Sequence, residues 1–140
     1  MKVQLNRIDE NFHFEGIGSS KISVHIDGSE EIGGQNAGAR PMELILMGLG
    51  SCGAMDIISI LKKQKEDLRD LKIFINGERD YNLTPAVFTN IEIEFHFYGN
   101  LDPKKVKKAV NLSMEKYCSV SAMLEKTAKI LYSYKIISLS

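Results

Sequence analysis

The stretch PMELILMGLGSCGAMDIISILKKQK, residues 41–65, decides the fold of this chain. Its residues are almost continuously apolar as far as Leu61, and a lysine-rich end follows. Pro41 stands where a helix accepts a proline, at its first position. This profile predicts a long helix that is buried through most of its length and that carries its cationic last turn to the solvent.

Three glycines, Gly48, Gly50 and Gly53, interrupt this predicted helix. Inside a helix each glycine costs roughly 1 kcal/mol relative to alanine, so their presence needs a compensating role. A glycine allows a neighbouring segment to approach closely because no side chain stands between the two backbones. We therefore expect another backbone to pack closely against this part of the helix.

Alternating apolar and polar residues on both sides of the helix predict β-strands. The predicted elements, in chain order, are an antiparallel meander within residues 1–27, a flexible loop at 33–40, the long helix, strands at 71–76 and 91–97, a helix that begins at Asp102 and Pro103, a helix from about 119 to 129, and a strand at 130–139. This order predicts an α+β fold with antiparallel strands around a long central helix, not a regular βαβ alternation.

Composition and charge describe an ordinary globular chain. Its 140 residues are 44% hydrophobic and 26% charged, and 18 acidic residues balance 18 basic ones. A net charge of zero argues against binding to nucleic acid or anionic membranes. Residues 1–7 lack the apolar core of a secretory signal, and no stretch approaches the ~18 apolar residues of a membrane span. We therefore expect one domain, residues 1–140, in the cytoplasm, without a nucleic-acid or membrane partner.

The only cysteines of the chain are Cys52 and Cys118. Such a pair can be a redox couple, a structural disulfide, a metal clamp or two buried core residues. A structural disulfide is disfavoured in the reducing cytoplasm. His13, His25 and His96 lack metal-ligand spacing to one another or to the cysteines, so we expect no metal site. A redox couple and two buried thiols remain as alternatives.

Residues 48–53 read Gly-Leu-Gly-Ser-Cys-Gly and match the G-x-G-x-x-G pattern of dinucleotide-binding folds. In those folds the pattern lies between a strand and a helix of a parallel βαβ unit. Here it lies within a proline-initiated apolar segment without a turn signal, and the following strands lack crossover helices. We therefore predict no bound cofactor.

Two segments of the chain resemble the OsmC/Ohr superfamily, most closely its YhfA-like branch. They are RPMELILMGLGSC at residues 40–52 and EKYCSVS at residues 115–121, and the resemblance extends over the full length, including the order of the elements. It implies an OsmC-like fold and an intertwined homodimer, in which the long helix of each subunit packs across the interface.

The resemblance also implies a chemistry, because family members with known activity are thiol peroxidases that act on organic hydroperoxides. Cys52 would then be the peroxidatic cysteine and Cys118 the resolving cysteine. A thiolate attacks the peroxide and becomes a sulfenic acid, which the second thiol converts to a disulfide. A dithiol reductant would restore the two thiols. The implied function is protection against oxidative stress.

The residues that support the thiolate depart from the family pattern. Better-known members use a glutamate ten residues before the cysteine and an arginine from the N-terminal strands. Here Met42 lies ten residues before Cys52 and Glu43 nine before it, and one residue turns a helical side chain by ~100°. No arginine lies between residues 8 and 39, so Arg40 is the candidate cation, with Lys21 and Arg79 as further possibilities.

The resemblance therefore implies Glu43 and Arg40 as supporting residues. The departure from the pattern keeps a second hypothesis open. In it the protein is a non-catalytic dimeric module that binds an apolar or electrophilic small molecule at its interface.

Overall fold

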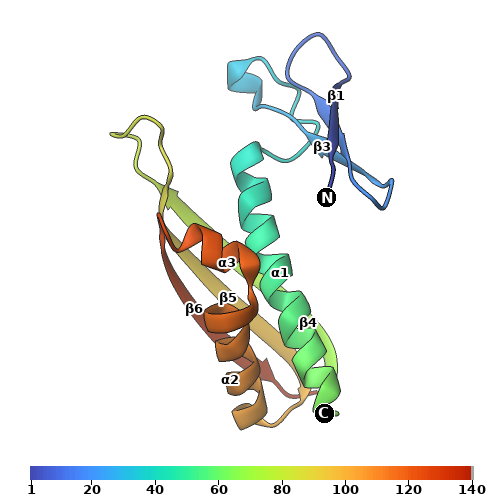
Figure 1. The fold of residues 1–140 in the computed structure, drawn as a ribbon, viewed down its shortest axis with the longest axis vertical. Coiled ribbons are helices and arrows are strands. Elements are labelled where there is room, and N and C mark those ends of the chain that lie inside the picture. Colours follow the sequence, from blue (N-terminus) through green and yellow to red (C-terminus); the bar gives the residue numbers. More distant parts are fainter. Residues whose placement is uncertain (140) are drawn as a thin grey trace. The chain divides into compact units, whose positions relative to one another are not determined.

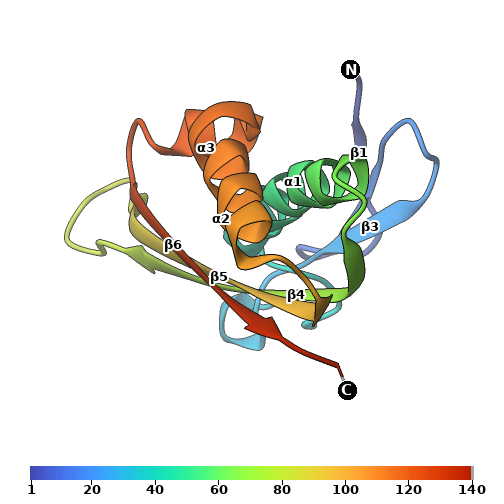
Figure 2. The ribbon, with the colours of Figure 1, turned by 90° about the horizontal axis from the view of Figure 1, so that it is seen from below.

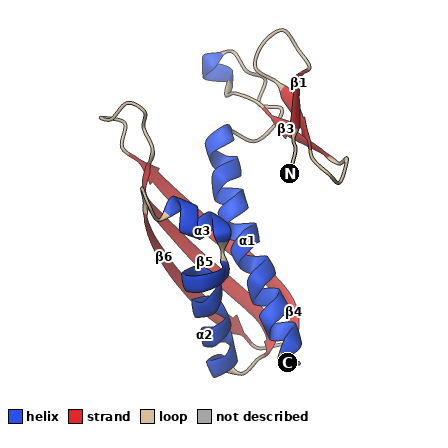
Figure 3. Cartoon of the chain, viewed as in Figure 1, coloured by secondary structure: helices blue, strands red, loops and turns tan. Residues whose placement is uncertain are grey.

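A computed structural model describes residues 1–139 and divides the chain into two compact units, residues 1–45 and 46–140 (Figure 1). The elements are β1 (Gln4–Arg7), β2 (Phe14–Ile17), β3 (Ser23–Ile26), the 3₁₀ turn η1 (Glu30–Ile32), α1 (Pro41–Lys63), β4 (Asp67–Arg79), β5 (Phe88–Asn100), α2 (Pro103–Leu112), the π-helical turn η2 (Ser113–Tyr117), α3 (Ser119–Leu124) and β6 (Lys129–Ile137). Figure 3 distinguishes these helices and strands by colour. The predicted α+β class is confirmed.

Residues 1–45 contain a three-stranded antiparallel sheet in the order β1-β2-β3, as the predicted meander requires. The buried carboxylate of Asp27 organises the loop after β3. It accepts hydrogen bonds from the backbone amides of Gly28, Gln35 and Ala37 at 2.7, 3.0 and 3.1 Å. The loop that glycine content predicted to be flexible is therefore tied to one side chain.

Residues 46–139 contain a second sheet in the order β4-β5-β6. β4 pairs with β5 in the antiparallel sense, whereas β6 runs parallel to β5. A parallel pair needs a long crossover connection, which α2, η2 and α3 supply. These helices and the adjoining part of α1 lie on one face of the sheet (Figure 2).

The core of this unit lies between the sheet and the helices. The inward side chains of β5 are Ile91, Ile93, Phe95 and Phe97, and each is at most 2% exposed. They alternate along the strand as predicted, because successive side chains point to opposite faces. From α1 the core receives its buried leucine and isoleucine side chains, namely Leu49, Ile57 and Leu61.

Only one face of α1 is buried, which corrects the prediction of a helix buried through most of its length. Met47, Met55 and Ile58 are exposed on it, because the sheet covers a single side of the helix. The prediction that no stretch approaches a membrane span was also wrong. α1 contains an 18-residue window of mean hydropathy 1.9, enough by length and composition to cross a membrane. This is weak evidence for a span, since the core helix of a folded domain passes the same test.

Within this chain, two of the helix glycines face side chains, and the expected approach of another backbone stays a prediction. A Cβ atom at Gly50 would collide with Cδ1 of Ile75 on β4. A Cβ atom at Gly53 would lie 3.3 Å from Sδ of Met114 in η2. Nothing lies within 4 Å of the corresponding position at Gly48. Two of the three glycines therefore lie where side chains within residues 46–139 pack closely against α1.

The C-terminal helix is shorter than predicted, and the last strand begins at Lys129. The carbonyl oxygen of Leu124 accepts hydrogen bonds from the amides of Thr127 and Ala128, at 3.1 and 2.9 Å, and this turn ends α3. Lys129 then pairs with Asn90 of β5. Strand pairing therefore overrides the local helical preference.

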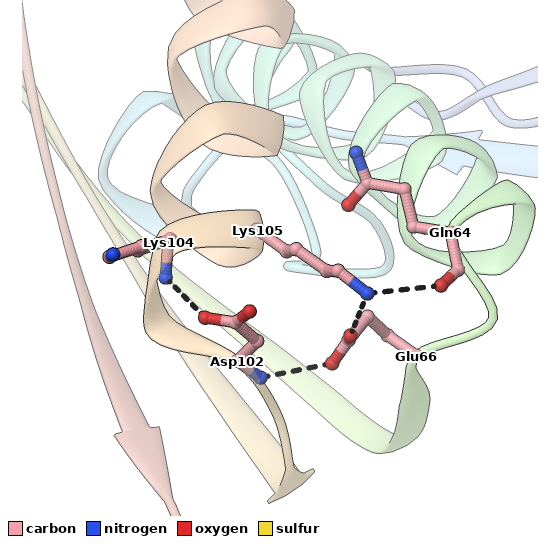
Figure 4. Close-up of polar contacts among 5 residues, drawn as sticks. All are labelled: Gln64, Glu66, Asp102, Lys104 and Lys105. Carbon is pink, nitrogen blue, oxygen red and sulfur yellow. Dashed lines mark hydrogen bonds and ion pairs between the residues drawn. The ribbon is translucent and has the colours of Figure 1, made fainter.

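Asp102 caps α2 as predicted, accepting a hydrogen bond from the Lys104 amide at 2.9 Å. Figure 4 shows that the Glu66 carboxylate joins this helix start to the end of α1. It accepts a hydrogen bond from the Asp102 amide at 2.9 Å and pairs with Nζ of Lys105 at 3.0 Å. The amide and then the ammonium group hold the pKa of Glu66 below its ordinary value of 4.5, against the smaller effect of burial.

Candidate functional site

The two cysteines are brought together by the fold of residues 46–139, although 66 positions (118 − 52) separate them in sequence. Cys52 is half-buried on α1, and Cys118 is 3% exposed between η2 and α3. Both are free thiols, and Cys52 lies near enough to Cys118 to help raise the pKa of the Cys118 thiol. The fold therefore makes neighbours of two thiols that are distant in sequence.

Cys118 is held by the backbone on three sides. Its amide donates a hydrogen bond to the carbonyl oxygen of Ser113 at 2.8 Å. Its sulfur accepts a hydrogen bond from the Ser121 amide at 3.4 Å and lies 4.0 Å from the carbonyl oxygen of Leu49 on α1. These contacts fix the sulfur between η2, the first turn of α3 and the central helix.

The surroundings of Cys118 favour its protonated form. Burial, against the lowering effect of the Ser121 amide and with a smaller contribution from the adjacent Cys52, raises the pKa of the Cys118 thiol to about 11. Cys118 is thus a thiol at neutral pH and is a poor first nucleophile. Of the two cysteines, the half-exposed Cys52 is the one that a substrate can reach.

Arg40 and Glu43 lie in the unit of residues 1–45 and bond to their immediate neighbours. The Glu43 carboxylate accepts a hydrogen bond from the Arg40 amide at 2.8 Å, which caps the start of α1. The Arg40 guanidinium donates to the carbonyl oxygen of Gly38 at 3.1 Å and to Oδ1 of Asn36 at 2.6 Å. Both side chains thus contribute to the approach of the loop to α1.

The other two candidate cations, Arg79 and Lys21, have no contact with Cys52 among the hydrogen bonds and ion pairs of the described residues. Nε of Arg79 donates to the carbonyl oxygen of Ala86 at 2.8 Å, and its guanidinium lies 5.3 Å from the centre of the Tyr81 ring. Lys21 occupies a turn with a φ of +65°. Within residues 46–139, no hydrogen bond or ion pair joins Cys52 to a lysine or arginine.

Each of the three histidines has a polar side-chain neighbour. Nε2 of His13 lies 2.9 Å from Nδ1 of His25, and Nε2 of His96 lies 2.7 Å from a Glu94 carboxylate oxygen. His13 precedes β2 and is not part of a strand. Among residues 1–139 no group of three or more histidine, cysteine or acidic side chains is arranged to hold a metal ion.

Sequence reasoning missed Ser113. Its hydroxyl is fully buried and donates a 2.9 Å hydrogen bond to the carbonyl oxygen of Gly53, the residue after Cys52. A lone serine at the end of a helix carries no pattern that predicts such a contact. The neighbouring Cys118 was the one signal that could have drawn attention to this turn.

A cavity of about 480 Å³ lies between α1 and α2, and some of the residues that line it are close to the cysteines in the sequence. Asp56, one helical turn after Cys52, and Tyr117, directly before Cys118, are both part of its wall. The remaining wall is formed by Ser59, Ile60, Lys63, Gln64, Lys108 and Leu112. Tyr117 therefore lines this space beside Cys118 in the sequence.

Comparison with known proteins identifies the scaffold. The family described as OsmC-like protein matches residues 33–133. Protein YhfA of Escherichia coli K12 is 38% identical over 130 residues, which cover 92% of this chain and 93% of YhfA. The crystal structure of a hypothetical protein from Aquifex aeolicus VF5 is similar with a TM-score of 0.86 and 32% identity, over 99% of this chain and 97% of that one.

A more distant structure shares the fold alone. The organic hydroperoxide resistance protein OhrB of Bacillus subtilis is similar with a TM-score of 0.66, over 96% of each chain, at 17% identity. The similarity to YhfA, by contrast, covers nearly the whole chain at an identity that shows common family membership.

Proposed function

The chain belongs to the OsmC-like protein family, and from that premise we propose that it is a cysteine-dependent thiol peroxidase that reduces organic hydroperoxides through Cys52 and Cys118. The observation that carries the proposal is the proximity of two free thiols of unequal burial. The name of the B. subtilis relative, an organic hydroperoxide resistance protein, supports the same class of substrate.

In the first step the Cys52 thiolate attacks the outer oxygen of the hydroperoxide. The O–O bond breaks, the leaving alkoxide takes up one proton and departs as an alcohol, and Cys52 becomes a sulfenic acid. The exposure of Cys52 supports its role as the attacking group, and the raised pKa of Cys118 argues against the reverse order.

In the second step the Cys118 sulfur attacks the sulfenic sulfur of Cys52. The S–O bond breaks, the thiol proton and the hydroxide leave as water, and a disulfide forms. Two electrons have then passed from the thiols to the peroxide. A cellular dithiol returns them by thiol–disulfide exchange and restores both cysteines.

Arg40 and Glu43 have supporting roles in this proposal. We assign to Arg40 the role of the cation that favours the Cys52 thiolate. Glu43 orders the start of α1 through its bond to the Arg40 amide. The proposal further includes a single OsmC-like domain over residues 1–140, a cytoplasmic location, and a homodimer built around α1. The family match across both compact units supports the single domain.

Thiol counting with tert-butyl hydroperoxide tests the proposal. We expect one equivalent to remove both free thiols of the wild type and to produce an intramolecular disulfide, detected by mass spectrometry. Cys118→Ser should lose one thiol and accumulate a sulfenic acid that dimedone traps. Cys52→Ser should consume peroxide no faster than buffer, and unchanged consumption by this variant would refute the proposal.

The same experiment separates the second hypothesis, a non-catalytic dimeric module that binds an apolar or electrophilic small molecule. The exposed apolar side chains of α1, such as Met55 and Ile58, are the observation that favours it. In that case Cys52→Ser and the wild type would be equally inert toward peroxide, and an apolar fluorescent probe would bind both with equal affinity.

A further inference from the structure

We propose that Ser113 is a positioning residue that holds the two thiols next to each other. It does so through the hydrogen bond from its hydroxyl to the carbonyl oxygen of Gly53 on α1. This role deepens the proposed function and rests on it.

The first observation is where η2 touches the central helix. The Ser113 hydroxyl donates to the carbonyl oxygen of Gly53 at 2.9 Å, with an oxygen of Asp56 a more distant 3.5 Å away. Ser113 is 0% exposed, so water cannot replace the bond without rearrangement of the turn. The anchor therefore lies one residue beyond Cys52.

The second observation is that Gly53 leaves room for this anchor. A Cβ atom there would lie 3.3 Å from Sδ of Met114 and 3.6 Å from Oγ of Ser113. Both atoms belong to η2, so any side chain at residue 53 would press on the turn that precedes Cys118. The glycine thus allows η2 to lie directly against α1.

The third observation is that Cys118, at the end of η2, bonds to the same serine. The amide of Cys118 donates to the carbonyl oxygen of Ser113 at 2.8 Å, a bond over five residues that defines the π-helical turn. The Ser121 hydroxyl closes the other side by donating to the carbonyl oxygen of Met114 at 3.3 Å. Ser113 therefore bonds α1 through its side chain and Cys118 through its backbone.

These contacts connect the two cysteines through a short rigid path. Cys52 is covalently linked to Gly53, Gly53 is bonded to the Ser113 hydroxyl, and the Ser113 carbonyl oxygen is bonded to the Cys118 amide. Loss of the hydroxyl removes the link between helix and turn and lets the Cys118 sulfur shift along α1. Such a shift lowers the effective concentration of one thiol at the other, and with it the equilibrium constant for forming the disulfide.

A glutathione redox buffer tests the role without peroxide. The equilibrium between the dithiol and the disulfide measures how well the fold presents the two thiols to each other. For Ser113→Ala we expect this equilibrium constant to fall by about tenfold to a hundredfold. Ser51→Ala is the matched control, because it removes another α1-bonded hydroxyl, and it should stay within about twofold of the wild type.

A pair of glycine variants provides a second measurement. Gly53→Ala and Gly48→Ala both add a methyl group to α1, but only the first meets η2. We expect Gly53→Ala to lower the equilibrium constant by at least about threefold and Gly48→Ala to leave it within about twofold. If Ser113→Ala fails to fold, as judged by circular dichroism, this glycine pair decides the question.

The outcomes separate this role from the peroxidase proposal. A wild type that forms the disulfide in glutathione but does not consume hydroperoxide refutes the peroxidase function and leaves the positioning role to be decided by the variants. Equal constants for Ser113→Ala and Ser51→Ala, or for the two glycine variants, overturn the positioning role. So does a wild type that forms no intramolecular disulfide in the buffer.

Discussion

The two compact units differ in what they bury. Residues 46–139 enclose an apolar core in which Phe95 and Phe97 are fully buried. In residues 1–45 the buried side chain at the centre is the carboxylate of Asp27, whereas Leu5 and Val24 are exposed. One unit is therefore stabilised by hydrophobic burial, and the other is ordered by hydrogen bonds to one charge. Apolar strands left uncovered in a single chain are what a second copy would cover in the proposed homodimer.

The candidate site residues are divided between the same two units. Cys52 and Cys118 meet through a long-range contact in the unit with the apolar core. Arg40 and Glu43 belong to the other unit and bond to residues at most four positions away. The thiol pair is therefore a product of packing, whereas the supporting pair is a product of local chain geometry.

The largest effect should come from removing a core side chain. Phe95→Ala should lower the free energy of unfolding by about 3–5 kcal/mol, because it empties a site that no solvent reaches. Phe12→Ala, in the other unit and 46% exposed, should lose less than about 1.5 kcal/mol. Urea unfolding at one protein concentration measures both, and equal losses would contradict the difference between the units.

The next effect concerns the exposed face of α1. We expect the wild type to sediment as a dimer, at twice 15.7 kDa. In Met55→Glu the dimer dissociation constant should rise by at least about a hundredfold, because a carboxylate would be buried in the interface without a partner. Met123→Glu is the control, since Met123 is 74% exposed on α3 and Met55 is 69% exposed on α1. A monomeric wild type, or equal behaviour of both variants, would remove the homodimer from the proposal.

A smaller effect should appear at the supporting cation. If Arg40 has its proposed role, Arg40→Ala should slow the oxidation of Cys52 by hydroperoxide about tenfold, because the charge assigned to the thiolate is lost. Arg7→Ala removes a guanidinium from the same unit that likewise bonds nearby backbone carbonyl oxygens, those of Glu10 and Asn11. Stopped-flow rates for the two variants should differ, and identical rates would exclude Arg40 as the activating cation.

The smallest effect is a pH dependence of stability. The pKa of Glu66 in the folded state lies below its ordinary value of 4.5. The charged Glu66 carboxylate therefore stabilises the fold fully above pH 4.5, and this stabilisation is lost as the pH falls through the folded-state pKa. The stability difference between wild type and Glu66→Gln should therefore shrink from about pH 6 to about pH 3. A difference that stays constant over this range would show that the Lys105 and Asp102 contacts do not depend on the charge.

The same sign applies to Asp27, where burial alone would raise the pKa. The amides of Ala37, Gln35 and Gly28 and the nearby His13 outweigh burial and hold the pKa of Asp27 below 3.8. Asp27→Asn should thus become equivalent to the wild type at low pH. In this unit it is the loop, and not an apolar core, that should lose order first on acidification.

Local patterns in the sequence predicted most of the fold. The alternation of Ile91, Ile93 and Phe95 predicted β5 and its buried face, because the side-chain period of a strand does not depend on its partners. Asp102 and Pro103 predicted the start of α2 for a similarly local reason. The predicted end of α3 was wrong, since pairing of the next residues with β5 decided it.

The site was predictable only in part. The resemblance to a family singled out the two cysteines, but nothing in the sequence indicated that Ser113 bonds Gly53 across 60 positions. Nor did the periodicity of α1 separate its buried from its exposed side chains, because apolar residues lie all around the helix. Which of them are covered depends on the position of the sheet, which is a property of the folded chain.

By itself the sequence determined the thiol inventory, the alternation of the strands and the starts of α1 and α2, all of which depend on residues a few positions apart. Only the tertiary structure decided that Cys118 is buried beside Cys52 and that its pKa rises to about 11. The physical reason is that desolvation and hydrogen bonding depend on what surrounds a group in space. For Cys118 those surroundings come from α1, η2 and α3, which meet only after the chain has packed.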